Sequence, residues 1–492
     1  MKFFRILILF VYSLNSYCQY DISKIIEDGK YALEHKDYLL AIKYFNNIIT
    51  YRPNNHEAYY YRASAKFALN DYMGSEIDLS TAIELNSFYY DAYSLRGLNR
   101  LNLKQYSEAL KDYIKCTTFN SSDISVWSNI AHCYLEINKY TKADSVCNII
   151  ISQWPNNPLG YILKAKCQYN LNNELLFKQL LDNSIKISPF NPEALEMLAL
   201  YSFQKGNWSS ALIFFSRSLY LNPNNSNNLV YRGICHIGNG DIKNGLKDFN
   251  NALSINPTNT CGLYNRGALL YVMGYKDKSL ADFFQICKIN QNENTANLFI
   301  NAIKNNEKIR FPHSPLKYND IRMLSDTTFA NRDKYVVDEN DMNILFKPRE
   351  IYHNFKSDIF NLYAPLPPCN LSEFANEAYD YPDSFHKGYE SLLAKDYSNA
   401  IEYYNECILN YPAICESYYN RAFAYFQTFN YDSAISDLDN AIKLNKNYAE
   451  AYYNRGILYL RIKKINRARL DFSKAGELGI DFAYTIVKDL YE

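Results

Sequence analysis

Hydrophobic and small residues recur along this chain with a period of 34 residues. Repeats begin at residues 22, 56, 90, 124, 158, 192, 226 and 260, and again at 381, 415 and 449. Within each repeat, positions 4, 8 and 11 share one face of a first predicted helix, and positions 20, 24 and 27 share one face of a second. The pattern therefore predicts a helical hairpin in every repeat.

Small residues at two positions explain how the helices of a hairpin can pack closely. Position 8 is always Gly or Ala, position 20 is mostly Ala, and position 24 is large and mostly aromatic, as in Gly456, Ala468 and Phe472. The small residues let the helices approach where the bulky side chains interlock. Proline at position 32, such as Pro53 or Pro412, ends the second helix.

This pattern resembles the tetratricopeptide repeat (TPR) family over roughly 370 residues. The resemblance implies an all-α fold, an α-solenoid of helical hairpins. We expect two blocks, with eight repeats in 22–293 and three in 381–480, and a capping helix in 481–492. Residues 294–380 are not a whole number of repeats and carry six prolines, so we expect a capping helix at 294–306 followed by a connector or small insert.

The first 18 residues have the pattern of a secretory signal peptide. Lys2 and Arg5 precede an apolar run at 6–14 that is too short to span a bilayer, and cleavage is expected after Cys18. A lipoprotein acylated at Cys18 is the alternative. No later stretch is apolar for 18 residues, so we expect no transmembrane segment in the mature chain. The Asn-, Lys-, Ile- and Tyr-rich composition resembles Bacteroidetes envelope proteins, which implies the periplasm.

Charge and cysteine content narrow the possible functions. The 52 basic and 52 acidic residues balance, which argues against nucleic acid or an anionic membrane as the main partner. Eleven cysteines in an exported chain would suggest disulfides. However, seven of them occupy predicted helical sites where small apolar residues pack, so we expect buried free thiols at Cys116, Cys133, Cys147, Cys167, Cys235, Cys287 and Cys407.

Six repeats carry an arginine at position 7 together with an aspartate at position 23. Because the two positions flank the seam between a repeat's helices, we expect an ion pair across it. A row of charges that binds a ligand is the alternative, and recent duplication could also produce the correlation. The expected pairs are Arg62–Asp78, Arg96–Asp112, Arg232–Asp248, Arg266–Asp282, Arg421–Asp437 and Arg455–Asp471.

A second set of residues lies at positions 5, 9 and 12, which point away from the packing face of the first helix. The TPR resemblance implies that this first-helix surface lines a concave groove that binds peptides or partner helices. Here it is rich in aromatic residues, although such rings can also simply pack against neighbouring repeats. The proposed peptide-binding residues are Tyr60, Phe67, Tyr264, Tyr271, Tyr389, Tyr419, Phe423, Phe426 and Tyr453, and Tyr169 and Phe203 occupy equivalent positions.

No catalytic pattern accompanies these features. The chain has no HExxH, P-loop or GxSxG motif, and its seven histidines have no metal-binding spacing, so we expect no metal, cofactor or catalytic residue. The sequence favours a non-enzymatic scaffold that binds a peptide segment or partner protein in the groove. Two alternatives remain, namely an enzymatic or ligand-binding activity in 294–380 and a self-associating structural envelope protein.

Overall fold

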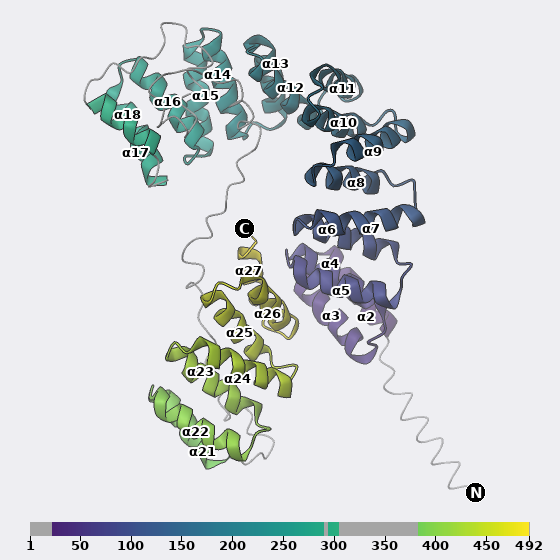
Figure 1. Ribbon diagram of the computed structural model, residues 1–492, viewed down its shortest axis with the longest axis vertical. Coiled ribbons are helices and arrows are strands. Elements are labelled where there is room, and N and C mark those ends of the chain that lie inside the picture. The colour runs from purple at the N-terminus through teal and green to yellow at the C-terminus, as the bar shows by residue number, and fades with distance from the viewer. Residues whose placement is uncertain (1–21, 290–293, 305–381, 492) are drawn as a thin grey trace. The chain divides into compact units, whose positions relative to one another are not determined.

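The computed structural model describes residues 22–289, 294–304 and 382–491. Within these ranges the only regular elements are α-helices, which follow one another as consecutive hairpins (Figure 1). The predicted fold class, an all-α solenoid of helical hairpins, is confirmed.

The helices keep the 34-residue period. The first helix of each repeat is α2 (Ile22–Glu34), α4 (His56–Ala68), α6 (Tyr90–Asn102), α8 (Ile124–Glu136), α10 (Pro158–Asn170), α12 (Pro192–Gln204), α14 (Ser226–Gly238), α16 (Thr260–Val272), α21 (Asp383–Leu393), α23 (Cys415–Gln427) and α25 (Ala449–Arg461). The second helix is α3 (Tyr38–Tyr51), α5 (Tyr72–Leu85), α7 (Tyr106–Phe119), α9 (Tyr140–Gln153), α11 (Glu174–Ile187), α13 (Trp208–Leu221), α15 (Ile242–Ile255), α17 (Lys276–Ile289), α22 (Tyr397–Asn410), α24 (Tyr431–Leu444) and α26 (Ile465–Glu477). Two further helices, α18 (Asn294–Lys304) and α27 (Ala483–Asp489), follow repeats 8 and 11.

A left-handed residue at position 15 turns the chain between the two helices of every repeat. Its φ angle is positive in all eleven repeats, and the residue is Gly in Gly206, Gly240 and Gly274 but Lys, Asn or Phe elsewhere. The next residue commonly caps the second helix, as where Asp37 accepts a hydrogen bond from the backbone N–H of Leu40. The turn is therefore encoded locally within each repeat.

Inside each hairpin, the small residue at position 8 faces the large one at position 24. A Cβ atom added to Gly97 would lie 2.8 Å from the ring of Tyr113, and one added to Gly456 would lie 2.9 Å from the ring of Phe472. Glycine at position 8 always accompanies an aromatic residue at position 24, whereas four of the five alanines at position 8 accompany Leu or Cys. The two positions are thus matched in volume, as close packing requires.

The chain divides into two compact units, each with its own core. One comprises residues 127–348, and its described part includes a cluster around Phe203, Phe215 and Phe249. Helix α18 covers the end of repeat 8 there, because Phe299 stacks on Phe283 with ring centroids 5.0 Å apart. The expected connector after residue 304 lies outside the described residues.

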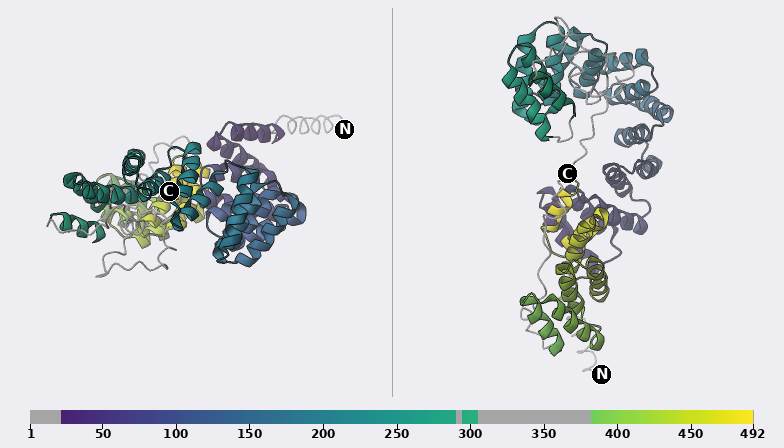
Figure 2. Two further views of the ribbon diagram at one scale, coloured as in Figure 1. Left: turned by 90° about the horizontal axis from the view of Figure 1, so that it is seen from above. Right: turned by 60° about the vertical axis from the view of Figure 1, so that its left-hand side comes forward.

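The other compact unit combines the described residues of 1–126 with those of 349–492. Within it, α26 of the last repeat packs against α3 and α5 of the first two repeats (Figure 1 and Figure 2). Helix α27 covers the end of repeat 11 with Ala483, Ile486 and Val487. Nearest-neighbour stacking of repeats does not predict the contact between the last repeat and the first two.

Candidate protein-binding surface

All six arginine–aspartate pairs are present as bidentate ion pairs. In each pair, Nε and Nη2 of the arginine donate to the two carboxylate oxygens of the aspartate. In Arg455–Asp471 the two N···O distances are 2.7 and 2.6 Å. This geometry matches the planar guanidinium to the carboxylate and holds the two helices of a repeat in register.

The same arginines also reach the preceding repeat, which the sequence analysis missed. Nη1 donates to the residue at position 25 of the previous second helix in five cases, with Asn46, Ser80, Asn250, Asn405 and Asp439 as acceptors. A short polar residue at position 25 before each such arginine was the available signal. The arginines therefore link neighbouring repeats as well as the helices within one repeat.

The ion pairs are largely enclosed by the protein. The side chain of Arg455 is 17% exposed and that of Asp471 is 7% exposed. Burial alone would lower the pKa of Arg455, but the hydrogen bonds and charge of Asp471 outweigh burial and raise this pKa above its ordinary value. The bonds on the guanidinium go to side chains of the protein, so a structural role accounts for these arginines without a ligand.

The structure divides the nine proposed aromatic residues into two groups. Three are buried, because Tyr264, Tyr419 and Tyr453 are only 3%, 1% and 3% exposed. Tyr419 accepts a hydrogen bond from Asn454 at 2.9 Å, and the ring of Tyr453 lies 5.5 Å from that of Phe472. These three rings are covered by other side chains of the array, so they offer no surface to a peptide and we remove them from the candidate surface.

The other six rings are half-buried and keep part of their surface open. They are Tyr60, Phe67, Tyr271, Tyr389, Phe423 and Phe426. Burial raises the pKa of the Tyr60 hydroxyl, whose ring lies 5.0 Å from that of Tyr89, the residue just before α6. Such rings combine a packed side with an accessible side, which suits recognition of an apolar segment.

Phe423 and Phe426 come closest to forming a local subsite. They line a shallow gap of about 10 Å³ between repeats 10 and 11, together with Leu438, Asn454 and Leu458. A gap of this size holds at most about one water molecule, so the rings would have to bind a partner on their outer faces. A larger hollow of about 440 Å³ lies beside Arg266 and Asp282 and includes none of the nine proposed rings.

The described ranges show the state of nine cysteines and whether any helix could cross a membrane. All nine cysteines there are free, and six are buried, namely Cys116, Cys133, Cys147, Cys167, Cys235 and Cys407, whereas Cys287 is half-buried. In the part of the chain that the structure describes, no helix has the length and apolar character needed to cross a membrane. The predicted signal peptide at 1–18 and the lipidation alternative at Cys18 lie outside the described residues.

The fold and the ion pairs define a helical-repeat protein built from 34-residue hairpins. Residues 430–463 match the family model of the TPR repeat. Human mitochondrial import receptor subunit TOM70 is 21% identical over 212 residues, which cover 40% of this chain and 34% of that protein. The Hsp70-Hsp90 organizing protein of Triticum aestivum is 25% identical over 118 residues, covering 24% and 20% of the two chains. This chain therefore spans about a third or less of the length of these relatives.

Two solved structures with a similar arrangement of helices illustrate the fold. A tetratricopeptide repeat protein from Parabacteroides merdae is 17% identical, with 51% of this chain and 98% of that chain covered and a TM-score of 0.38. PilW, a type IV pilus biogenesis factor, is 14% identical, with 41% and 94% covered and a TM-score of 0.37.

Proposed function

We propose that this protein is an exported, non-enzymatic scaffold that binds a peptide segment or partner protein on its first-helix surface. The observation that carries the proposal is the set of six half-buried rings at positions 5, 9 and 12. Aromatic side chains with one packed face lose little conformational freedom on binding and present a large apolar area. The relatives support the class of protein-binding scaffold, since they are named as a receptor subunit and an organizing protein.

The test compares variants of the Phe423–Phe426 pair. The mature chain is immobilised and incubated with an extract of its own cell envelope, and bound proteins are identified by mass spectrometry. Phe423→Ser with Phe426→Ser is expected to lose the specifically bound partner. Phe429→Asn is the matched control, because Phe429 lies in the same repeat, is 78% exposed and is not part of the first-helix surface.

Loss of the same partner from the control variant would contradict a role for the first-helix surface. Retention of the partner by the double variant, with its helical circular dichroism unchanged, would contradict the role of Phe423 and Phe426.

Export is proposed from the charged start and apolar run of residues 1–18. The mature protein is expected to begin at Gln19 and to lie in the periplasm without a lipid. Intact-mass measurement of the protein from its own cells tests this proposal. A retained Met1 would exclude cleavage, and a diacylglyceryl group on Cys18 would identify a lipoprotein instead.

A further inference from the structure

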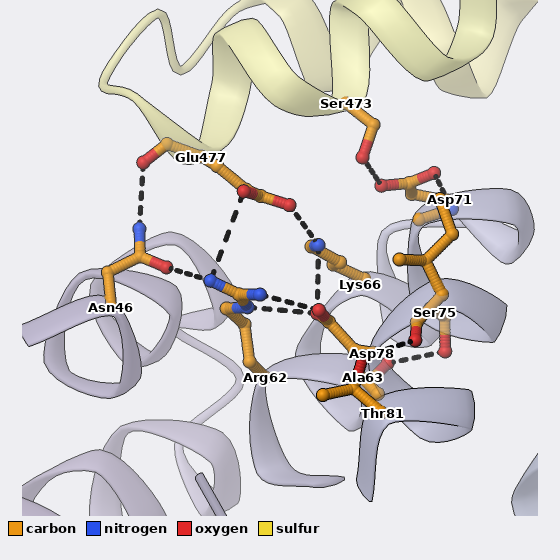
Figure 3. A network of polar contacts seen from close by, with 12 residues as sticks. Asn46, Arg62, Ala63, Lys66, Asp71, Ser75, Asp78, Thr81, Ser473 and Glu477 are labelled. Carbon is orange, nitrogen blue, oxygen red and sulfur yellow. Dashed lines mark hydrogen bonds and ion pairs between the residues drawn. The ribbon is translucent and has the colours of Figure 1, made fainter. Parts of the chain in front are cut away.

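The last repeat docks on the first two through a network of buried polar contacts (Figure 3). Ser473 of α26 donates to the Asp71 carboxylate at 2.5 Å, and Asn46 of α3 donates to the backbone carbonyl of Glu477 at 2.7 Å. The Lys66 ammonium donates to the Glu477 carboxylate. Tyr484 of α27 adds an apolar contact, because it lies in the core cluster of the first two repeats and is only 3% exposed.

The cations on this face of repeats 1 and 2 are balanced in part by a carboxylate from the docked α26. Lys66 is 1% exposed and lies 2.8 Å from Asp78, the same aspartate that pairs with Arg62. Glu477 supplies the second negative charge for Lys66 and Arg62, and Lys474 of α26 pairs with the same carboxylate. Without Glu477, Lys66 and Arg62 would share Asp78 as their ion-pair partner, and an undercompensated buried charge is unfavourable.

Repeat 2 also departs from the other repeats where α26 approaches. Gly74 stands at position 19, and a Cβ atom there would lie 2.2 Å from Ser473 Oγ and 2.2 Å from the Asp71 carboxylate. An alanine at this site would therefore push apart the hydrogen-bonded pair Ser473–Asp71. All other repeats carry a side chain at position 19, namely Leu40, Glu108, Lys142, Leu176, Ser210, Asn244, Lys278, Asn399, Ser433 and Arg467.

We propose that this face of repeats 1 and 2 is a docking site for the α26–α27 end of the array, and that the end of a second copy can occupy it. The contacts join side chains, and one backbone carbonyl, of segments more than 400 residues apart in sequence. The same atoms would meet if α26 came from another chain, so exchange between two copies needs no new surface. The inference is independent of the proposed function.

The test separates the docking site from the docking end. Gly74→Lys blocks the face but leaves α26 intact, and Lys142 and Lys278 are exposed at the same position of other repeats. Glu477→Lys leaves the face intact but places a third cation beside Lys66 and Arg62. Each variant alone is expected to be monomeric by light scattering. An equimolar mixture is expected to form a heterodimer through the one intact face and the one intact end.

The control mixture combines Gly74→Lys with the Gly74→Lys/Glu477→Lys double variant, which leaves no intact face, and it should stay monomeric. A monomeric test mixture, with both proteins folded by circular dichroism, would overturn the proposal. If Gly74→Lys fails to fold, Lys66→Met replaces it as the variant with an altered face. If Glu477→Lys fails to fold, Ser473→Lys replaces it as the variant with an altered end, and the same mixing experiment is repeated.

Discussion

Arg455 and Asp471 face each other across the last hairpin and share two hydrogen bonds of 2.7 and 2.6 Å. Arg455→Ala and Asp471→Ala are each expected to lower the free energy of unfolding by about 1.5–3 kcal/mol, because each change removes charge-assisted hydrogen bonds from a mostly buried group. The double variant should lose less than the sum, with a coupling of about 1–2 kcal/mol in urea unfolding.

The exposed pair Lys387–Asp383 is the matched control for this double-mutant comparison. Its side chains are 52% and 81% exposed, so its coupling should be below about 0.5 kcal/mol. Strict additivity at Arg455 and Asp471 would show that their hydrogen bonds contribute nothing specific to stability.

The volume match between positions 8 and 24 predicts a compensating pair of substitutions. Gly97→Ala should destabilise the protein by about 1–3 kcal/mol, because the added methyl group meets the Tyr113 ring at 2.8 Å. Adding Tyr113→Leu should recover part of the loss, since repeat 2 naturally combines Ala63 with Leu79. Thermal unfolding measures both changes, and a double variant less stable than Gly97→Ala alone would contradict the match.

The bond between Arg421 and Asn405 links repeat 10 to repeat 9 at 2.6 Å. Asn405→Ala is expected to weaken this junction by about 0.5–1 kcal/mol, a modest effect because Asn405 is exposed. Hydrogen exchange in α22 should accelerate relative to exchange in α24. Asn410→Ala, at an exposed site in the same helix, is the control, and equal effects of the two changes would exclude a junction role for Asn405.

The docked end should make stability depend on pH through Asp71. Burial raises the pKa of Asp71 from 3.8 to about 6, although Lys66 and Ser473 act in the opposite direction. An acid whose pKa is raised by folding contributes stability that is present below pH 3.8 and is lost as the pH rises through about 6. Unfolding at pH 5 should therefore require more urea than at pH 7, by an amount that Asp71→Asn reduces.

Glu477 opposes this gain in stability at low pH. Lys66 and Arg62 hold the pKa of its carboxyl well below the ordinary value in spite of burial. Its contribution is therefore present above the ordinary glutamate pKa and is lost as the pH falls below that value. Glu477→Gln should therefore reduce the loss of stability at low pH. An Asp71→Asn variant whose stability differs between pH 5 and pH 7 as much as that of the unmodified protein would contradict the assignment to Asp71.

The sequence by itself determined the hairpins and their internal pairs. Positions 8, 20 and 24 describe contacts within one repeat, and Arg455 and Asp471 are only 16 residues apart. Such contacts recur along the chain, the ion pair in six of the eleven repeats, so the 34-residue period reveals them. The same period also predicts that each repeat stacks on its neighbour, because a single hairpin cannot bury its own apolar face.

Only the tertiary structure decided which rings stay accessible and where the chain's end docks. Tyr419 and Phe423 both lie on the predicted first-helix surface, but the next repeat buries Tyr419 and leaves Phe423 half-open. The docking site depends on Gly74, the only glycine at position 19 of the repeats, and on Lys66 and Glu477, which stand at positions where the repeats vary. A period describes what the repeats share, so it cannot locate a contact made by the features in which one repeat differs from the rest.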